Sequence, residues 1–179
     1  MNITLPLALT FARIGAIPLV LALFYLPVPY ARQVATVVFV FAGITDWVDG
    51  WLARRWNQTS AFGAFLDPVA DKLLVATCLI MLLWDEPSGL LALLVTVIIG
   101  REIAVSALRE WMAELGSRNS VSVSWIGKLK TGFQMTAIGM MIWQIDVWAL
   151  PIYLMGYALL VVAAVLTMYS MMVYLRAAW

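Results

Sequence analysis

Four aspartates in two closely spaced pairs are the residues of this 179-residue chain best suited to chemistry. Asp46 and Asp49 are three positions apart, and Asp67 and Asp71 are four positions apart, in segments that are otherwise mostly apolar. Residues at these spacings share one face of an α-helix, so each pair would present two carboxylates together. An aspartate at the centre of a membrane-spanning helix is unfavourable by about 2.5–3.5 kcal/mol, and such residues are usually functional.

A divalent cation would relieve the repulsion among four carboxylates if the two helices turn these faces toward each other. The sequence contains no histidine and only one cysteine, Cys78, so oxygen ligands dominate and favour Mg²⁺ or Mn²⁺ over Zn²⁺. Because Mg²⁺ in proteins commonly shares phosphate oxygens of a substrate, the pattern predicts a phosphate-bearing substrate.

The residues around the aspartates fit close approach by such a substrate. Gly50 and Ala53 are small and lie beside Asp49, and Arg54 with Arg55 could meet phosphate oxygens. Each has a plainer alternative, because small residues often serve helix packing and arginines often mark the ends of spans. Pro68 lies between the second pair and predicts a kink or a helix start nearby.

The composition places these residues in a membrane protein. Hydrophobic residues make up 64% of the chain, against roughly 45–50% in soluble proteins, and charged residues only 12%. The net charge of +1 supplies no basic field for a nucleic-acid partner. A single cysteine excludes an intrachain disulfide, and no removable signal peptide is expected.

Six apolar segments are long enough to cross a bilayer, which takes about 20 residues each. Turn-forming residues separate most of these segments. We therefore predict an all-α integral membrane protein with six transmembrane helices, organised as a single domain over residues 1–179. The expected spans are 5–26, 32–56, 63–84, 89–115, 124–145 and 147–175.

The basic residues predict the orientation. With six spans, both termini and all but one of the 11 Lys and Arg residues fall on one side, and Arg32 alone falls on the other. Basic residues accumulate on the cytoplasmic side of membrane proteins, so both termini and the aspartates are expected there.

The residues Asp46, Asp49, Gly50, Ala53, Arg54, Gly63, Asp67 and Asp71, at these spacings, resemble the signature of the CDP-alcohol phosphotransferase family. The remainder of the chain is similar to the bacterial phosphatidylglycerophosphate synthase branch of that family. This similarity rests on Thr10 and Arg13, on the segment 101–110 and on the segment 124–130.

The resemblance implies a fold, an activity and a set of roles. It implies a homodimeric six-helix enzyme of the bacterial inner membrane that moves a phosphatidyl group from CDP-diacylglycerol to sn-glycerol 3-phosphate and releases CMP. Asp46, Asp49, Asp67 and Asp71 would hold two Mg²⁺ or Mn²⁺ ions, and Asp71 would also act as the general base. The CDP-lipid would meet Gly50, Ala53, Arg54, Ser60 and Gly63.

The acceptor carries a phosphate, so a basic pocket is expected. The candidates are Arg101, Arg109, Lys128 and Lys130, and Glu102 is spaced to pair with Arg109 on one helix face. Thr10 and Arg13 would line the mouth of the same cavity, or Arg13 would extend along the helix to the surface. Basic residues on this side are also expected from topology alone.

Two alternatives stay open at this stage. The same metal site could serve another acceptor, such as inositol phosphate, phosphatidylglycerol or another polar alcohol. Intramembrane carboxylates are also found in cation and proton transporters, although those would be expected near the bilayer midplane and accessible from both sides.

Overall fold

Six helices form the whole of the regular structure in the residues that the computed structural model describes. The backbone is described for residues 5–56, 61–114 and 125–178, and side chains for 7–45, 62–63, 65–108, 110–112 and 129–172. Within these ranges no strand is present, and the predicted all-α fold with six helices is confirmed. The helices are α1 (Leu5–Tyr25), α2 (Ala31–Trp56), α3 (Ala61–Asp85), α4 (Gly89–Glu114), α5 (Trp125–Trp143) and α6 (Ile152–Ala178).

The last helix begins later than predicted, at Ile152 rather than at position 147. Trp148 and Ala149 both have positive φ, and Val147 and Leu150 exchange backbone hydrogen bonds across them. Asp146 Oδ1 accepts a hydrogen bond from the Ile152 backbone nitrogen at 3.2 Å, as an N-terminal capping residue does. Residues 147–150 therefore form a tight turn, because their backbone hydrogen bonds join residues within the turn.

Helix α3 begins before Pro68 and not at this proline. It begins at Ala61 and continues through Pro68 to Asp85. Proline has no backbone N–H, so one hydrogen bond of the helical ladder is missing at this turn. Pro68 thus lies inside the helix between Asp67 and Asp71, and the helix does not start there.

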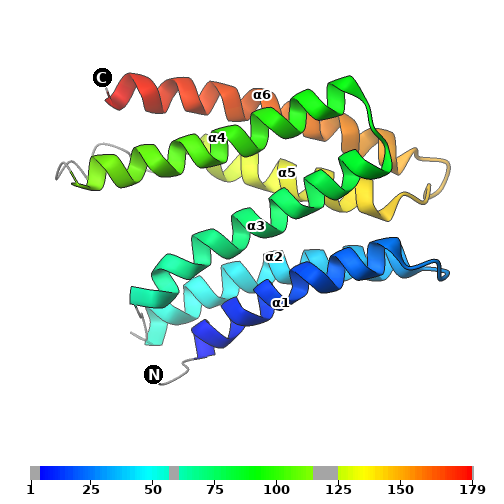
Figure 1. Cartoon of the computed structure of the whole chain (residues 1–179), viewed down its shortest axis with the longest axis horizontal. Coiled ribbons are helices and arrows are strands. Elements are labelled where there is room, and N and C mark those ends of the chain that lie inside the picture. Colours follow the sequence, from blue (N-terminus) through cyan, green and yellow to red (C-terminus); the bar gives the residue numbers. More distant parts are fainter. Residues whose placement is uncertain (1–4, 57–60, 115–124, 179) are drawn as a thin grey trace.

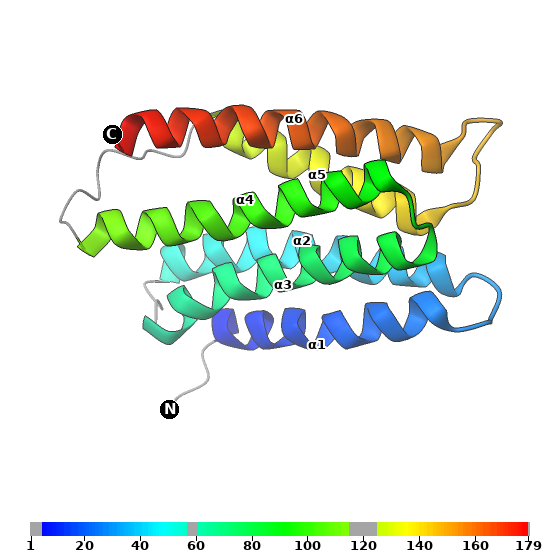
Figure 2. The ribbon, with the colours of Figure 1, turned by 45° about the horizontal axis from the view of Figure 1, so that its top comes forward.

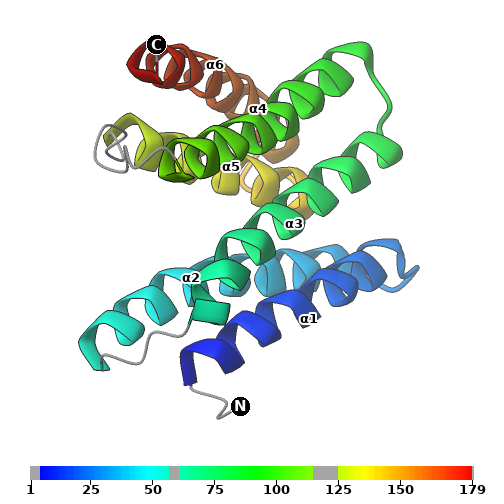
Figure 3. The ribbon, with the colours of Figure 1, turned by 60° about the vertical axis from the view of Figure 1, so that its left-hand side comes forward.

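The helices form two groups that α3 connects (Figures 1 and 2). The α1–α2 hairpin makes one group, and α4, α5 and α6 pack together as the other, while α2 also packs on α5. Helix α3 crosses obliquely between the groups (Figure 3), and among the described residues it contacts α1 far more than α2. The buried core lies where these elements meet and includes Phe39, Leu79, Ile138, Met141 and Leu160.

A close approach of α5 and α6 depends on one glycine. A Cβ atom at Gly156 would lie 2.9 Å from the Ala137 carbonyl oxygen and 2.9 Å from the Met140 Cβ. Small residues at such crossings let two helix backbones come together, a common way of packing helices in membranes.

An arginine joins several helices at one end of the bundle. Both termini lie at one end, and the connections α1–α2, α3–α4 and α5–α6 lie at the other (Figure 1). At the latter end Arg32 donates to both carboxylate oxygens of Asp85 at 2.9 and 2.7 Å, and it also donates to Gln144. The guanidinium lies 4.2 Å from the centre of the Phe24 ring. Arg32 thereby links the α1–α2 hairpin to the other group of helices.

Three of the helices are long and apolar enough to cross a membrane by length and composition. In the described residues these segments are Leu7–Tyr25, Gly89–Met112 and Ile152–Met172, and a shorter apolar stretch covers Ala31–Thr45 of α2. The chain is therefore a multi-pass membrane protein. That all six helices cross stays a prediction.

Candidate functional site

Helix α1 supplies a polar partner to both Asp67 and Asp71 of α3. Thr10 Oγ1 donates a hydrogen bond to Asp67 Oδ1 at 2.5 Å, and Arg13 Nη1 donates to Asp71 Oδ1 at 2.9 Å. Thr10 and Arg13 are three apart, and Asp67 and Asp71 four apart, so one face of each helix meets the other. Both donors are buried, and the structure thus brings four of the expected site residues together.

Arg13 is buried inside the protein and bonds to two other helices. Its side chain is 0% exposed, whereas that of Asp71 is 43% exposed. Arg13 Nε also donates to the backbone oxygen of Ala42 on α2 at 3.3 Å. A buried guanidinium is stable only when it is paired and hydrogen-bonded in this way. Arg13 therefore does not extend to the surface, and it connects α1, α2 and α3 at the site.

The contact with Ala42 lies one helical turn before the acidic segment of α2. Ala42 and Asp46 are four positions apart on one continuous helix, so they share a face. The Asp46 and Asp49 side chains lie outside the described residues. That Asp46 and Asp49 face Asp67 and Asp71 stays a prediction.

The donor chemistry fits a hard divalent cation. Asp67 and Asp71 lie one turn apart on α3, and all ligand candidates supply oxygen, as Mg²⁺ and Mn²⁺ prefer. The bond from Thr10 orients the Asp67 carboxylate, as hydrogen bonds to ligating carboxylates commonly do. No group of three or more potential metal ligands occurs among the described side chains, from which Asp46 and Asp49 are missing.

A cavity of about 200 Å³ opens beside Asp71 between α3, α4 and α5. It combines carboxylate, ammonium, hydroxyl and amide groups with two apolar residues. Its lining residues are Pro68, Asp71, Lys72, Val75, Glu102, Thr131 and Gln134.

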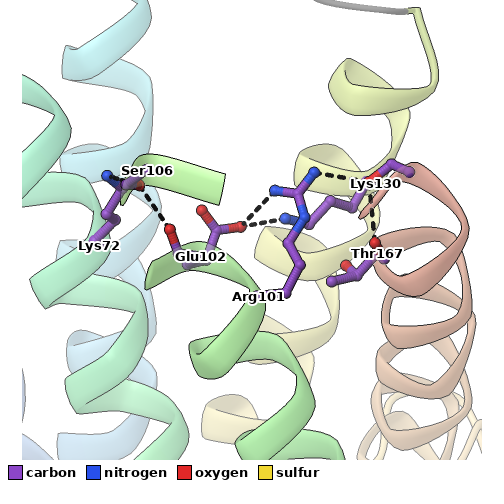
Figure 4. Close-up of polar contacts among 7 residues, drawn as sticks. Lys72, Arg101, Glu102, Ser106, Lys130 and Thr167 are labelled. Carbon is purple, nitrogen blue, oxygen red and sulfur yellow. Dashed lines mark hydrogen bonds and ion pairs between the residues drawn. The ribbon is translucent and has the colours of Figure 1, made fainter. Parts of the chain in front are cut away.

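Two buried basic residues contact Glu102, which lines this cavity (Figure 4). Glu102 forms ion pairs with Lys130 of α5 and, at 3.4 Å, with Arg101 of its own helix. Arg101 also donates to Ser170 Oγ of α6 at 2.7 Å. Both cations are buried, so two of the four expected acceptor-binding residues come together around one carboxylate.

A third cation, Lys72, lines the cavity from α3. Lys72 donates a hydrogen bond to Ser106 of α4, whose hydroxyl in turn donates to the Glu102 backbone oxygen at 2.6 Å (Figure 4). Lys72 and Asp71 are adjacent in the chain and line the same cavity. The site therefore carries positive charge on two sides of Glu102.

Several expected site residues lie outside the described part of the structure. The backbone of Gly63 is buried in the first turns of α3. Ser60 is not described at all. For Gly50, Ala53, Arg54, Arg109 and Lys128 only the helical backbone is described. The expected pairing of Glu102 with Arg109 therefore stays a prediction. The observed partners of Glu102 are Lys130 and Arg101.

Sequence reasoning did not single out Lys72, Thr131 or Gln134, which line the cavity. A signal for the last two was present. Thr131 directly follows Lys130, and Gln134 lies four positions after Lys130, so Lys130 and Gln134 share a helix face in an otherwise apolar stretch.

Comparison with known proteins gives this arrangement a family. Residues 3–174 match the family described as CDP-alcohol phosphatidyltransferase. The chain belongs to this family. Its aspartate-rich segment, its six helices and the contacts between Thr10, Arg13 and the α3 aspartates are therefore those of a CDP-alcohol phosphatidyltransferase.

Curated relatives in this family cover nearly the whole chain. A protein of Salmonella choleraesuis (strain SC-B67) is 51% identical over 178 residues, which are 99% of this chain and 96% of that protein. Proteins of Shigella flexneri serotype 5b (strain 8401) and Escherichia coli (strain K12) are each 50% identical over the same shares. All three are named CDP-diacylglycerol–glycerol-3-phosphate 3-phosphatidyltransferase.

Proposed function

We propose that this protein transfers the phosphatidyl group of CDP-diacylglycerol to sn-glycerol 3-phosphate, giving phosphatidylglycerol phosphate and CMP. The observation that carries this conclusion is identity of about half the residues over 99% of the chain with relatives named for this reaction. The cavity beside Asp71, with acidic and basic groups on facing helices, suits a reaction between two phosphate compounds. The enzyme thus acts in phospholipid biosynthesis.

The proposed chemistry begins at Asp71. Its carboxylate accepts the proton of the acceptor's 1-hydroxyl, and the oxygen then attacks the phosphorus that carries diacylglycerol. The bond from this phosphorus to the CMP oxygen breaks, and CMP leaves with the electron pair. Arg13 holds the Asp71 carboxylate at 2.9 Å, so the base is oriented before the substrate arrives.

Asp46, Asp49, Asp67 and Asp71 would hold two Mg²⁺ or Mn²⁺ ions. When bound, such ions stabilise the negative charge that develops on the attacking and leaving oxygens in phosphoryl transfer. Thr10 keeps the Asp67 carboxylate in a single orientation through its hydrogen bond. Gly50, Ala53, Arg54, Ser60 and Gly63 would bind the CDP part of the lipid.

The acceptor phosphate is proposed to bind the cations around Glu102. Lys130 and Arg101 are both buried and already oriented by this carboxylate. Arg109 lies about two turns after Glu102 on α4, and Lys128 precedes Lys130 by two positions on α5, and both would complete the pocket. A neutral acceptor would not require such a concentration of buried positive charge.

The proposed setting is the bacterial inner membrane, with both termini and the site on the cytoplasmic side. With six spans, ten of the 11 basic residues are expected on the side of the termini, in keeping with the charge rule for cytoplasmic loops. The substrate lipid reaches the site within the membrane, whereas glycerol 3-phosphate is soluble. A homodimer is proposed as the functional assembly.

Purified protein in lipid nanodiscs tests the proposal directly. CMP release is measured with CDP-diacylglycerol and, separately, glycerol 3-phosphate, inositol phosphate, phosphatidylglycerol or serine. Of these acceptors, only glycerol 3-phosphate is expected to support CMP release. Equal or faster release with another acceptor would reassign the substrate, while absence of CMP from every reaction would contradict phosphatidyl transfer.

A further inference from the structure

Gln134 carries a buried amide in the wall of the cavity beside Asp71. The residue lies on α5 and is 4% exposed. Gln134 Oε1 accepts no hydrogen bond from any residue in the described part of the chain. Leaving a buried amide oxygen without a donor is unfavourable, so such a group in a cavity wall indicates an exchangeable partner.

The partner must fit the cavity that Gln134 lines. Its volume is about 200 Å³, whereas a water molecule takes up roughly 30 Å³ in the liquid. The cavity can therefore hold a molecule of several heavy atoms. Asp71 lines it from α3 and Glu102 from α4, while Thr131 and Gln134 line it from α5. A ligand here would meet the proposed general base and the Gln134 amide at the same time.

The chemistry of an amide suits a hydroxyl group. It offers an acceptor oxygen and two N–H donors, so it can bind a hydroxyl that donates, accepts or does both. The phosphate of the acceptor is drawn to cations instead, and these lie around Glu102. The cavity and the cations next to its Glu102 wall thus offer separate groups for a reacting hydroxyl, for a phosphate and for one further polar group.

We propose that Gln134 is a specificity-determining residue that hydrogen-bonds the acceptor hydroxyl that does not react. In glycerol 3-phosphate this is the 2-hydroxyl, next to the carbon that carries the attacking oxygen. The inference rests on the proposed function and deepens it, because it assigns a residue to the recognition of a vicinal diol. An acceptor without the second hydroxyl would leave the buried amide unpaired and would be used less well.

The test compares two acceptors that differ only in this hydroxyl. Glycerol 3-phosphate and 3-hydroxypropyl phosphate share the reacting hydroxyl and the phosphate, and CMP release gives kcat/KM for each. The wild-type enzyme is expected to prefer glycerol 3-phosphate by about 10-fold to 100-fold, because the other acceptor would leave one buried polar group without a hydrogen-bond partner. In Gln134→Met, which keeps a side chain of similar length without hydrogen bonding, the preference is expected to disappear.

The same substitution at another glutamine provides the matched control. Gln33 donates to the Trp143 backbone oxygen at 3.0 Å, close to the end of the bundle opposite the site. Gln33→Met removes one amide hydrogen bond but is expected to leave the preference between the two acceptors unchanged. A change there equal to that in Gln134→Met would overturn the assignment.

The remaining outcomes separate this inference from the proposed function. If wild-type enzyme releases CMP with both acceptors at equal kcat/KM, Gln134 does not recognise the hydroxyl, whether or not any variant folds. Equal losses for both acceptors in Gln134→Met would likewise overturn the inference and indicate a packing role. If wild-type enzyme releases no CMP with glycerol 3-phosphate, the proposed function fails, and this inference fails with it.

Discussion

Arg13 and Asp71 form an ion pair across 2.9 Å that joins a fully buried guanidinium to a carboxylate on the cavity wall. The two residues are 58 positions apart in the chain. Because Arg13 also holds the Ala42 carbonyl of α2, its position is determined by three helices. Asp71 can therefore keep one orientation while part of its side chain stays accessible to substrate.

Replacing Arg13 should impair catalysis through the orientation of Asp71. Arg13→Met is expected to lower kcat by about 10-fold to 100-fold, the usual range for partners that orient reactive or metal-binding groups. Arg13→Lys should recover little, because one ammonium on a different stem cannot reproduce the planar fork that meets Asp71 and Ala42 together. Steady-state CMP release provides kcat and KM.

Arg32→Met is the matched control for this change, since Arg32 is also ion-paired with an aspartate, but at the other end of the bundle. It should lower the unfolding temperature without a comparable loss of kcat in the folded fraction. A normal kcat in Arg13→Met would show that Asp71 needs no orienting partner.

Removing the proposed general base should nearly abolish turnover. Asp71→Asn keeps the size of the side chain but cannot accept the proton of the attacking hydroxyl, so kcat should fall by about 10²-fold to 10⁴-fold. Binding of CDP-diacylglycerol, measured by titration in nanodiscs, should be largely retained. Turnover close to that of wild type would assign the base to another residue.

Chelation tests the ion that the aspartates are expected to hold. EDTA should stop CMP release, and Mg²⁺ or Mn²⁺ should restore it, since only oxygen ligands are proposed at the site. Restoration should require the aspartates, so Asp67→Asn should need a higher Mg²⁺ concentration for half-maximal activity. Full activity in the presence of chelator would exclude the metal from the mechanism.

Binding of the acceptor phosphate should depend on Lys130. Lys130→Met removes a cation and leaves Glu102 without one of its two ion-pair partners, so KM for glycerol 3-phosphate should rise by about 10-fold or more. The KM for CDP-diacylglycerol should change much less. Adding Glu102→Gln should recover part of the affinity, because the double variant no longer places an unbalanced carboxylate beside the phosphate. Equal increases in both KM values would instead indicate a general distortion.

The crossing of α5 and α6 should tolerate no side chain at Gly156. A Cβ there would lie 2.9 Å from Ala137 and Met140, so Gly156→Ala should lower the free energy of unfolding by about 1–3 kcal/mol, as overpacking usually does. Gly100→Ala on α4 is the control, since nothing lies within 4 Å of its Cβ position. Alanine favours a helix over glycine by roughly 0.5–1 kcal/mol, so this variant should be neutral or more stable. Equal destabilisation of both proteins would contradict the close crossing.

Local patterns in the sequence were sufficient to predict the six helices and to single out the aspartates as candidate functional residues. Apolar runs of the length that a bilayer demands, separated by turn residues, placed the first four helices within two residues of their observed ends. The aspartates were recognisable because a charge in an apolar segment is unfavourable unless it has a function. The start of α6 was predicted wrongly, because the Val147–Leu150 turn is built from apolar residues and carries no turn signal.

Only the tertiary structure decided which side chains meet. The partners Thr10 and Arg13 lie more than 50 positions from Asp67 and Asp71, and Glu102 pairs with Lys130 of another helix. Such pairs depend on how far each helix is rotated about its axis and on which helices cross. The periodicity within one helix defines its faces but not the helix that covers them, and therefore Gln134 could be placed beside Asp71 only once α3 and α5 were packed together.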